Sequence, residues 1–180
     1  MGRPKALLPL RGKTFLENIL EVIGATSIEH TVVVVGHHRE EIEKCVRPPV
    51  HVIFNPDYEQ GMITSFQTGI RALPSQTSAA LLFLVDHPLV DPTTIELLIA
   101  KSVPDRIVLP VYQGRRGHPV LFGADILQEI LSLPAFQGAN IVVRKDPNRI
   151  VQVSVDAPGI LVDVDTPDDF QRLQNEHESR

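Results

Sequence analysis

The chain has 180 residues, of which 43% are hydrophobic and 22% are charged, and its net charge is −5. This length fits a single domain, residues 1–180, whose core can bury roughly 70% of the unfolded chain's surface. A negative net charge argues against a nucleic-acid-binding protein, because neutralising several phosphates requires a basic face. Cys45 is the only cysteine, which excludes an internal disulfide and a cysteine-ligated zinc site and fits a reducing, cytoplasmic setting. The apolar stretch 6–10 is too short for a signal peptide or a membrane span, so we expect no membrane association.

Apolar runs typical of β-strands recur along the chain, at residues 31–35, 50–54, 80–85, 107–111, 119–122, 151–155 and 160–162. The runs TVVVV and ALLFLV are apolar at every position, as in strands that are covered on both faces. Helix-like segments separate most of these runs and also lie before the first run and after the last one. Three helix-like segments begin with residues typical of helix caps, namely Thr14 with Glu17, Asp91 before Pro92, and Thr166 before Pro167. This alternation predicts an α/β layered fold with a parallel sheet core.

The opening segment MGRPKALLPL combines a glycine with two cations ahead of an apolar cluster. Such a segment could hold a phosphate, because Lys5 supplies a point charge and Arg3 a planar fork of donors, next to Gly2. The alternative is an exposed basic N-terminus without a ligand.

Asp86 lies in LFLVDHPLV, where it follows five apolar residues and precedes Pro88, which cannot extend a central strand. This pattern places the Asp86 carboxylate at the carboxyl end of a buried strand, where open α/β sheets bind their ligands. A carboxylate there suits Mg²⁺, which completes its shell with waters and substrate phosphates. The alternative is that Asp86 only caps the following turn.

The segment ILVDVDTPDDF gives a second candidate strand end, with Asp163 and Asp165 two residues apart. That spacing puts both carboxylates on the same side of an extended chain. If this segment lies beside Asp86, the carboxylates can share one metal ion. Helix capping and the helix dipole account for Asp168 and Asp169 but explain Asp163 less well.

Two loops could contact other parts of a substrate. In NPDYEQGMITS, Gly61 opens a helix whose first N–H groups, as far as Ser65, could face a base or ribose, although an ordinary helix start is the alternative. In QGRRGHP, Arg115, Arg116 and His118 could bind an anionic acceptor, and the alternative is a solvated hairpin tip.

Taken in order, these segments resemble the molybdenum cofactor nucleotidyltransferase family, the guanylyl- and cytidylyltransferases that attach a nucleotide to molybdopterin. The pieces that carry the resemblance are MGRPKALLPL, NPDYEQGM with Ser65, LVDHPLVDP, GHPVLFG and LVDVDTPDDF. The resemblance implies a three-layer α/β/α sandwich of the Rossmann-like nucleotidyltransferase type, with a mostly parallel sheet. It also implies Mg²⁺-dependent transfer of a CMP or GMP group from CTP or GTP to a molybdopterin-type phosphate acceptor, with release of pyrophosphate.

The same resemblance implies roles for individual residues. Lys5 and Asp86 would be the catalytic pair, with Gly2 and Arg3 beside Lys5 at the triphosphate. Residues near the base and the acceptor would be Gly61, Met62, Ser65 and His118. Asp86 would hold Mg²⁺ together with Asp163 or Asp165, of which Asp163 is favoured. A molybdoenzyme or its chaperone would be a further partner, and GHPVLFG with DVDTPDD look closer to the cytidylyl branch.

This sequence departs from the family at its start. Members carry a first strand and a glycine-rich turn of the form LAAGxSxR directly before the MGxPK segment, whereas this sequence begins at that methionine. Two explanations stay open: a start site placed too late, or a true truncation that has lost catalysis. Two other functions also stay open, a non-catalytic nucleotide-binding module and a nucleotidyltransferase that acts on a sugar or polyol phosphate.

Overall fold

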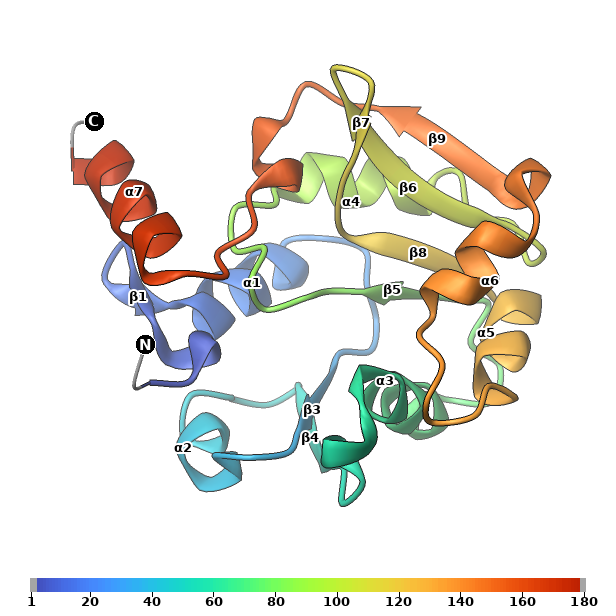
Figure 1. Ribbon diagram of the computed structural model, residues 1–180, viewed down its shortest axis with the longest axis horizontal. Helices are drawn as coiled ribbons and strands as arrows, with labels where there is room; N and C mark the ends of the chain where they lie inside the picture. The colour runs from blue at the N-terminus through green and yellow to red at the C-terminus, as the bar shows by residue number, and fades with distance from the viewer. Residues whose placement is uncertain (1–2, 179–180) are drawn as a thin grey trace.

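The computed structural model describes residues 3–178 (Figure 1). The strands are β1 (Pro9–Leu10), β2 (Lys13–Thr14), β3 (Val32–Val35), β4 (His51–Phe54), β5 (Ala79–Leu82), β6 (Ile107–Tyr112), β7 (Arg115–Arg116), β8 (Val120–Gly123) and β9 (Ile150–Ser154). The α-helices are α1 (Phe15–Gly24), α2 (Arg39–Glu43), α3 (Met62–Ala72), α4 (Pro92–Ile99), α5 (Ala124–Leu131), α6 (Asn140–Lys145) and α7 (Pro167–Glu178). Short 3₁₀ helices are η1 (Lys5–Leu7), η2 (Tyr58–Gln60), η3 (Pro147–Arg149) and η4 (Pro158–Leu161). Within this described part, no helix is both long enough and apolar enough to cross a bilayer.

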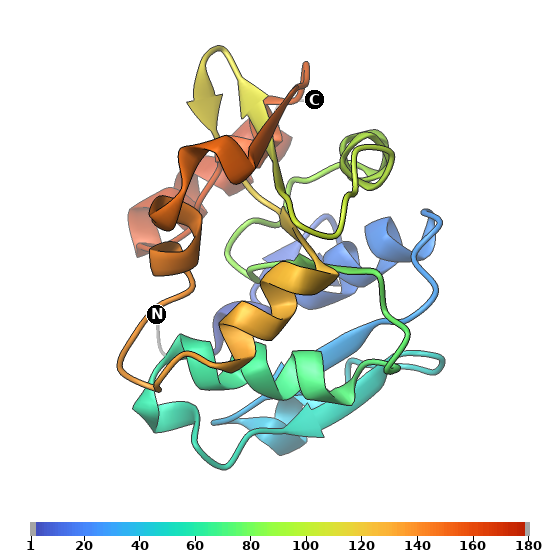
Figure 2. The ribbon, with the colours of Figure 1, turned by 90° about the vertical axis from the view of Figure 1, so that its right-hand side faces the viewer.

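The strands form two main groups that lie apart from each other (Figures 1 and 2). β3 and β4 pair in parallel, while the other group has the order β5-β8-β6-β7, with β9 parallel to β6. Because β8 is antiparallel to both β5 and β6, the strands β5, β6 and β9 point the same way.

Helices cover both faces of the larger group of strands. On one face, α3 and α5 bury Ile63, Ile70 and Ile126 against Phe122. On the other face, Leu98 of α4 lies in a second apolar cluster with residues of β6, β8 and β9. This three-layer α/β arrangement with a mostly parallel sheet confirms the predicted fold class.

The predicted starts of α1, α4 and α7 are confirmed by their hydrogen bonds. The Glu17 amide donates to Thr14 Oγ1 at 3.2 Å, and the Thr14 amide donates back to the Glu17 carboxylate at 2.7 Å. Asp91 accepts from the Thr94 amide ahead of α4, and Thr166 caps α7 in the same manner as Thr14. Each cap provides a hydrogen-bond acceptor for an amide in the first turn that has no acceptor within the helix.

Two predicted strands differ in the structure. Residues 160–162 were expected to be extended, but Ile160 belongs to η4, because Pro158 and Gly159 favour a tight turn over a strand. The run 80–85 pairs only as far as Leu82, and the chain then turns, with the His87 amide donating to the Leu84 carbonyl at 3.1 Å. Asp86 therefore lies in a turn beyond β5 and not directly at the strand's last residue.

The first and last parts of the described chain pack together at the left of Figure 1. Leu8, Leu10 and Phe15 form one buried cluster with Val164 and with Leu173 of α7. This cluster holds η1 and the segment before α7 next to each other, which decides where the charged residues of both segments lie.

Away from the acidic residues, the Glu129 side chain of α5 links this helix to the segment that leads into β9. Its carboxylate accepts hydrogen bonds from Lys145 at 2.6 Å and from Arg149 at 2.7 Å. These hydrogen bonds, that from Lys145 first, hold the pKa of Glu129 below its ordinary value. A lowered folded-state pKa means that the interaction stabilises the fold above the unfolded pKa and is lost as pH falls through the folded pKa.

We therefore expect Glu129→Gln to reduce the free energy of unfolding by about 1 kcal/mol near neutral pH. At acid pH, below the folded-state pKa of Glu129, the difference from the parent chain should shrink, because the protonated carboxyl no longer carries the charge that Lys145 and Arg149 bind. Urea denaturation at the two pH values measures this, with the exposed Glu59→Gln as the control. Equal losses at both pH values would contradict the assignment.

Candidate active site

A main-chain hydrogen bond joins the turn that contains Asp86 to the segment that contains Asp163 and Asp165. The Val164 amide donates to the Asp86 carbonyl at 3.0 Å. Val164 is fully buried in the cluster with Leu8 and Phe15, so its two neighbours in sequence point the other way. Asp163 and Asp165 therefore lie on the solvent side of this segment, beside Asp86.

Lys5 lies among these carboxylates. Its Nζ is 3.5 Å from Asp86 Oδ2 and also donates a hydrogen bond to Asp165. Burial by itself would lower the pKa of Lys5, but the hydrogen bond to Asp165 and the charges of Asp86 and Asp165 outweigh it and raise that pKa. The ammonium group is thus the counterion of the acidic cluster.

Asp86, His87 and Asp163 each offer one ligand atom, and these atoms lie within 4.8 Å of one another. Two buried polar atoms of this group have no hydrogen-bond partner among the described residues, Asp86 Oδ1 and His87 Nδ1. Burial, followed by the charges of Asp86 and Asp165, raises the pKa of Asp163. Crowded carboxylates with unused lone pairs are the setting that a divalent cation stabilises, so this group can hold a metal ion.

Sequence reasoning did not single out His87. The signal was its place directly after Asp86 and before Pro88, but an isolated histidine has no distinctive spacing. The structure buries it, leaving only 7% of the residue exposed, and turns one ring nitrogen toward the two carboxylates.

His118 lies on top of His87, with 4.6 Å between the ring centroids. Burial, with a further contribution from His87, lowers the pKa of His118 to about 4, against the opposing charge of Asp86. The imidazole is therefore neutral near neutral pH, and it can exchange hydrogen bonds with a ligand but cannot serve as a cation for one.

The GHP segment is fixed against η4. The His118 amide donates to the Ile160 carbonyl at 3.0 Å, and a Cβ atom at Gly117 would lie 2.5 Å from that same oxygen. A glycine is therefore required for this close approach. Arg115 and Arg116, by contrast, are exposed on β7, and no ion pair of theirs is found between described residues.

The first turn of α3 borders the same region. Asn55 is 1% exposed and donates hydrogen bonds of 2.9 Å to Thr64 and to Ser65. Gly61 caps the helix with a φ of 122°, a left-handed conformation that favours glycine. Met62 is 62% exposed.

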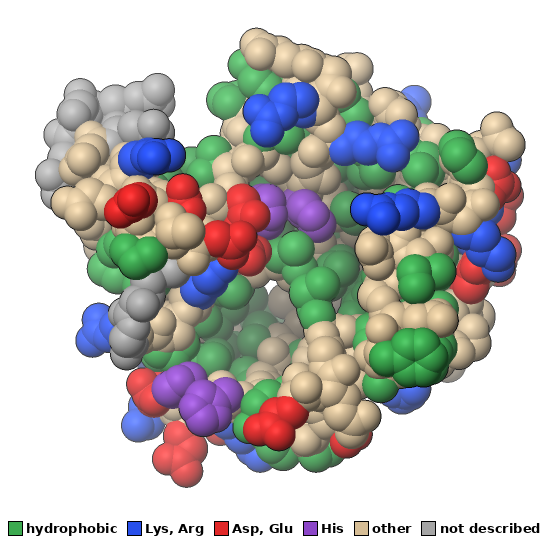
Figure 3. Space-filling model, in the orientation of Figure 1, with side chains coloured by type: hydrophobic (Ala, Val, Ile, Leu, Met, Phe, Trp, Pro, Cys, Tyr) green, Lys and Arg blue, Asp and Glu red, His purple; other side chains and the backbone are tan. Residues whose placement is uncertain are grey.

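A cavity lies beside the first turn of α3. Met62 and Ser65 line it together with Leu84 and Val85, which lead directly to Asp86. Figure 3 shows acidic and histidine side chains at the rim of a hollow in this face, with apolar side chains inside it. The structure thus brings the predicted residues Lys5, Asp86, Asp163, Asp165 and His118 to one place. Met62 and Ser65 line the cavity whose wall also includes Val85, the residue before Asp86.

Two predicted residues are not part of this grouping. Arg3 is exposed, and no ion pair of it with another described residue is found. Gly2 lies outside the described residues.

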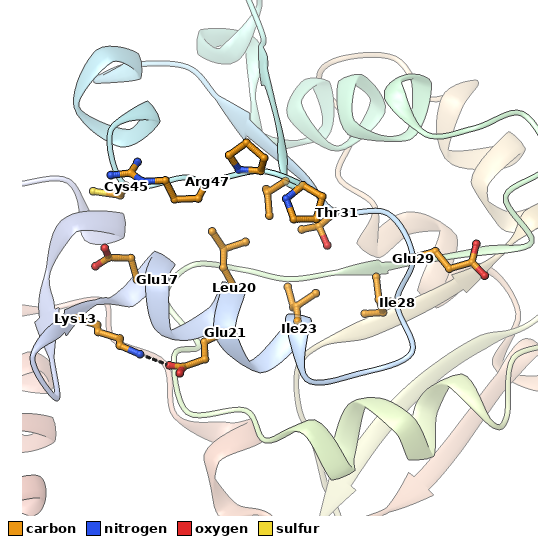
Figure 4. A pocket seen from close by; sticks show the side chains of 14 residues that line it. Lys13, Glu17, Leu20, Glu21, Ile23, Ile28, Glu29, Thr31, Cys45 and Arg47 are labelled. Carbon is orange, nitrogen blue, oxygen red and sulfur yellow. Dashed lines mark hydrogen bonds and ion pairs between the residues drawn. The ribbon is translucent and has the colours of Figure 1, made fainter.

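A second groove of about 560 Å³ lies between α1 and the segment that includes Arg47 (Figure 4). An ion pair of 2.6 Å between Lys13 and Glu21 lies along it. None of the residues predicted for catalysis or for metal lines this groove. The candidate active site is therefore the acidic cluster and not this groove.

The chain is similar to proteins of known sequence and structure over nearly its whole length. It is 30% identical to nicotine blue oxidoreductase of Paenarthrobacter nicotinovorans, over 96% of this chain and 89% of that relative. It is 27% identical to the molybdenum cofactor cytidylyltransferase of Escherichia coli, over 94% of this chain and 86% of that relative. The crystal structure of Rv0371C of Mycobacterium tuberculosis in complex with manganese matches with a TM-score of 0.82 and 25% identity. The match covers 97% of this chain and 93% of that one.

The signature of the MobA-like NTP transferase domain matches residues 1–152. That match spans most of the chain and includes Lys5, Asp86, His87 and His118. The chain therefore belongs to the family of MobA-like NTP transferases, which are nucleotidyltransferases.

Proposed function

We propose that this protein transfers a CMP or GMP group from CTP or GTP to a molybdopterin-type phosphate acceptor and releases pyrophosphate. The observation that carries the proposal is the cluster of Asp86, His87 and Asp163 with Lys5 as its counterion. Carboxylates and a lysine at one point suit a triphosphate with its cation. This residue set favours nucleotidyl transfer over the oxidoreductase activity for which one relative is named.

The reaction requires little covalent help from the protein. An oxygen of the acceptor phosphate forms a bond to the α-phosphorus, and the bond from that phosphorus to the bridging oxygen breaks as pyrophosphate leaves. Positioning and charge neutralisation account for most of the acceleration in such transfers. No side chain of this protein needs to become covalently attached to the nucleotide.

Asp86 and Asp163 would hold Mg²⁺, with His87 as a nitrogen donor at the edge of the same group. The unused buried lone pair of Asp86 Oδ1 supports this assignment. The bound cation would neutralise negative charge on the triphosphate. Asp165 is favoured as the partner of Lys5, because it accepts the lysine's hydrogen bond, which leaves Asp163 for the metal.

On this proposal, the Lys5 side chain has two alternative sets of binding partners. Without ligand it pairs with Asp86 and Asp165. With a cation held by the carboxylates, Lys5 would be free to bind triphosphate oxygens, together with Arg3 and Gly2. One lysine thus stabilises the empty cluster and then the substrate.

The two sides of the hollow would bind the rest of the substrates. Gly61, Met62 and Ser65 at the start of α3 would contact the nucleoside. His118, which is neutral near neutral pH, would donate a hydrogen bond to the acceptor. The similarity to a molybdenum cofactor cytidylyltransferase, over nearly the whole chain, supports CTP as the nucleotide. The recipient of the product would be a molybdoenzyme or its chaperone.

The metal assignment predicts the effect of removing either carboxylate. Asp86→Asn and Asp163→Asn should each lower the rate of pyrophosphate release from CTP or GTP, with acceptor and Mg²⁺, by at least about 100-fold. Each variant should also weaken metal binding in calorimetric titrations with Mg²⁺ and Mn²⁺. The matched control is Asp168→Asn, in the first turn of α7, which should retain both properties.

Several outcomes would contradict the proposal. Full activity of both asparagine variants would remove the carboxylates from the mechanism. Tight binding of a triphosphate by the parent chain without turnover would support a non-catalytic module. Turnover with a sugar or polyol phosphate in place of the pterin acceptor would support the alternative transferase.

The double role of Lys5 yields a second prediction. Lys5→Met removes the cation that competes with metal, so metal titrated without nucleotide should bind several-fold more tightly. The same variant should transfer nucleotide at least about 10-fold more slowly, because the triphosphate loses a positive partner. Calorimetry and pyrophosphate release measure the two effects separately.

Lys13→Met serves as the control, since Lys13 pairs with Glu21 far from the cluster. If Lys5→Met weakened metal binding, the lysine would be acting as a structural support of the cluster and not as its competitor.

A further inference from the structure

The segment between β4 and α3 is held by the side chain of Asn55. Asn55 follows β4 directly, and its main-chain amide donates to the Val35 carbonyl at 2.9 Å, next to the pairing of β3 with β4. The residue is only 1% exposed. A buried amide group destabilises a protein unless its polar atoms are hydrogen-bonded, and those of Asn55 are.

The partners of Asn55 fix the orientation of its amide group. The main-chain N–H of Asp57 donates to Asn55 Oδ1 at 3.0 Å. A main-chain N–H can only donate, so the atom that faces Asp57 must be the oxygen, and the NH₂ group must face the other way. That nitrogen lies 2.9 Å from Thr64 Oγ1 and 2.9 Å from Ser65 Oγ. Both hydroxyl groups therefore accept a hydrogen bond from Asn55.

The two hydroxyl groups differ in where their own protons go. Thr64 is 7% exposed, and its hydroxyl donates to the carbonyls of Asp57 and Gly61, at 2.9 and 2.8 Å. No acceptor for the Ser65 proton is found in the part of the chain that the structure describes. Ser65 is half-buried and lines the cavity beside α3. Its O–H is thus the donor that this network leaves for a ligand.

We propose that Asn55 is a positioning residue of the nucleoside site, which holds the Ser65 hydroxyl as a hydrogen-bond donor to an acceptor atom of the base. This inference rests on the proposed nucleotidyl transfer and adds to it a residue that touches no substrate. An O–H that accepts one hydrogen bond is also a stronger donor of the next. Met62, Phe66 and Leu84 line the same cavity, and apolar walls suit the faces of a base better than a ribose.

Calorimetric titration with CTP and GTP, in the presence of Mg²⁺, compares the parent, Ser65→Ala, Asn55→Leu and the double variant. Ser65→Ala should weaken binding of the preferred triphosphate by about 10-fold, because the acceptor atom of the base loses its partner. Asn55→Leu should weaken it by a similar factor, because a released serine hydroxyl turns back to a main-chain carbonyl of its own helix. In the double variant the two losses should overlap, within about 2-fold of the larger single loss, since Asn55 acts through Ser65.

A second variant, Asn55→Asp, keeps the shape of the side chain and covers the case in which Asn55→Leu does not fold. Its carboxylate has no proton to donate and accepts the Ser65 proton instead, so the hydroxyl turns away from the cavity. Binding of the triphosphate should weaken by at least the factor seen with Ser65→Ala. Binding equal to that of the parent would overturn the role of Asn55.

The matched control is Gln67→Leu. Gln67 is another buried amide of α3, 7% exposed, and it donates to the carbonyls of Ile130 and Leu133 and not to Ser65. Its replacement should lower the free energy of unfolding, because two carbonyls lose their donor, yet leave triphosphate binding within about 2-fold of the parent's. Binding of Mn²⁺ without nucleotide should be the same in all variants, which reports that the acidic cluster is intact.

The outcomes that overturn this inference are distinct from failure of the proposed transfer. Losses that multiply in the double variant would show that Asn55 only supports the fold of the segment before α3. Equal binding by Ser65→Ala and the parent would remove the hydroxyl from the site and leave the proposed transfer intact, whereas a parent that binds neither triphosphate would contradict both. A loss on Ser65→Ala that disappears with the 2′-deoxy or 3′-deoxy triphosphate would assign the contact to the ribose and overturn the contact with the base.

Discussion

The candidate active site depends on one main-chain hydrogen bond, from the Val164 amide to the Asp86 carbonyl. These two residues are far apart in sequence and come from segments without regular pairing, so no sheet register places them. What holds them together is the burial of Val164 with Leu8 and Phe15, which fixes the orientation of the segment. Once Val164 points inward, Asp163 and Asp165 must point outward. The apolar cluster and the acidic cluster are therefore two sides of the same short segment.

This arrangement has an electrostatic cost, because three carboxylates are brought to one point. The raised pKa of Asp163 expresses that cost, and burial contributes to it before the charges of Asp86 and Asp165 do. Lys5 offsets the repulsion from within the protein, and its own pKa is raised for that reason. On the proposed function, a divalent cation would take over this neutralisation and add one further positive charge to the cluster. The contacts between Lys5 and the carboxylates would then be exchanged for contacts with a metal ion and a triphosphate.

The features that could be predicted from the sequence are those that depend on residues close together in the chain. The capping pairs at Thr14, Asp91 and Thr166 were confirmed, and so was the common orientation of Asp163 and Asp165, because both follow from fixed spacings along the chain. One failure depends on a distant segment, because strand 80–85 ends where its pairing partner β8 ends, at Val120. At residues 160–162 the local turn chemistry of Pro158 and Gly159 outweighs the apolar run, and the turn is held by the hydrogen bond from the His118 amide to the Ile160 carbonyl. Helices α5 and α6 lie between the predicted strands 119–122 and 151–155, and ADILQEIL carries the helical spacing of Ile126, Leu127 and Ile130.

The turn that presents Asp86 and His87 is supported by the hydrogen bond from Val164 and by apolar contacts of Val85 and Leu89. Lys5 contacts the same turn through Asp86 and is also held by Asp165. On the proposed function, the residues that would hold the cation therefore depend on the apolar cluster behind them. A substitution in that cluster would then alter cation binding without touching a substrate.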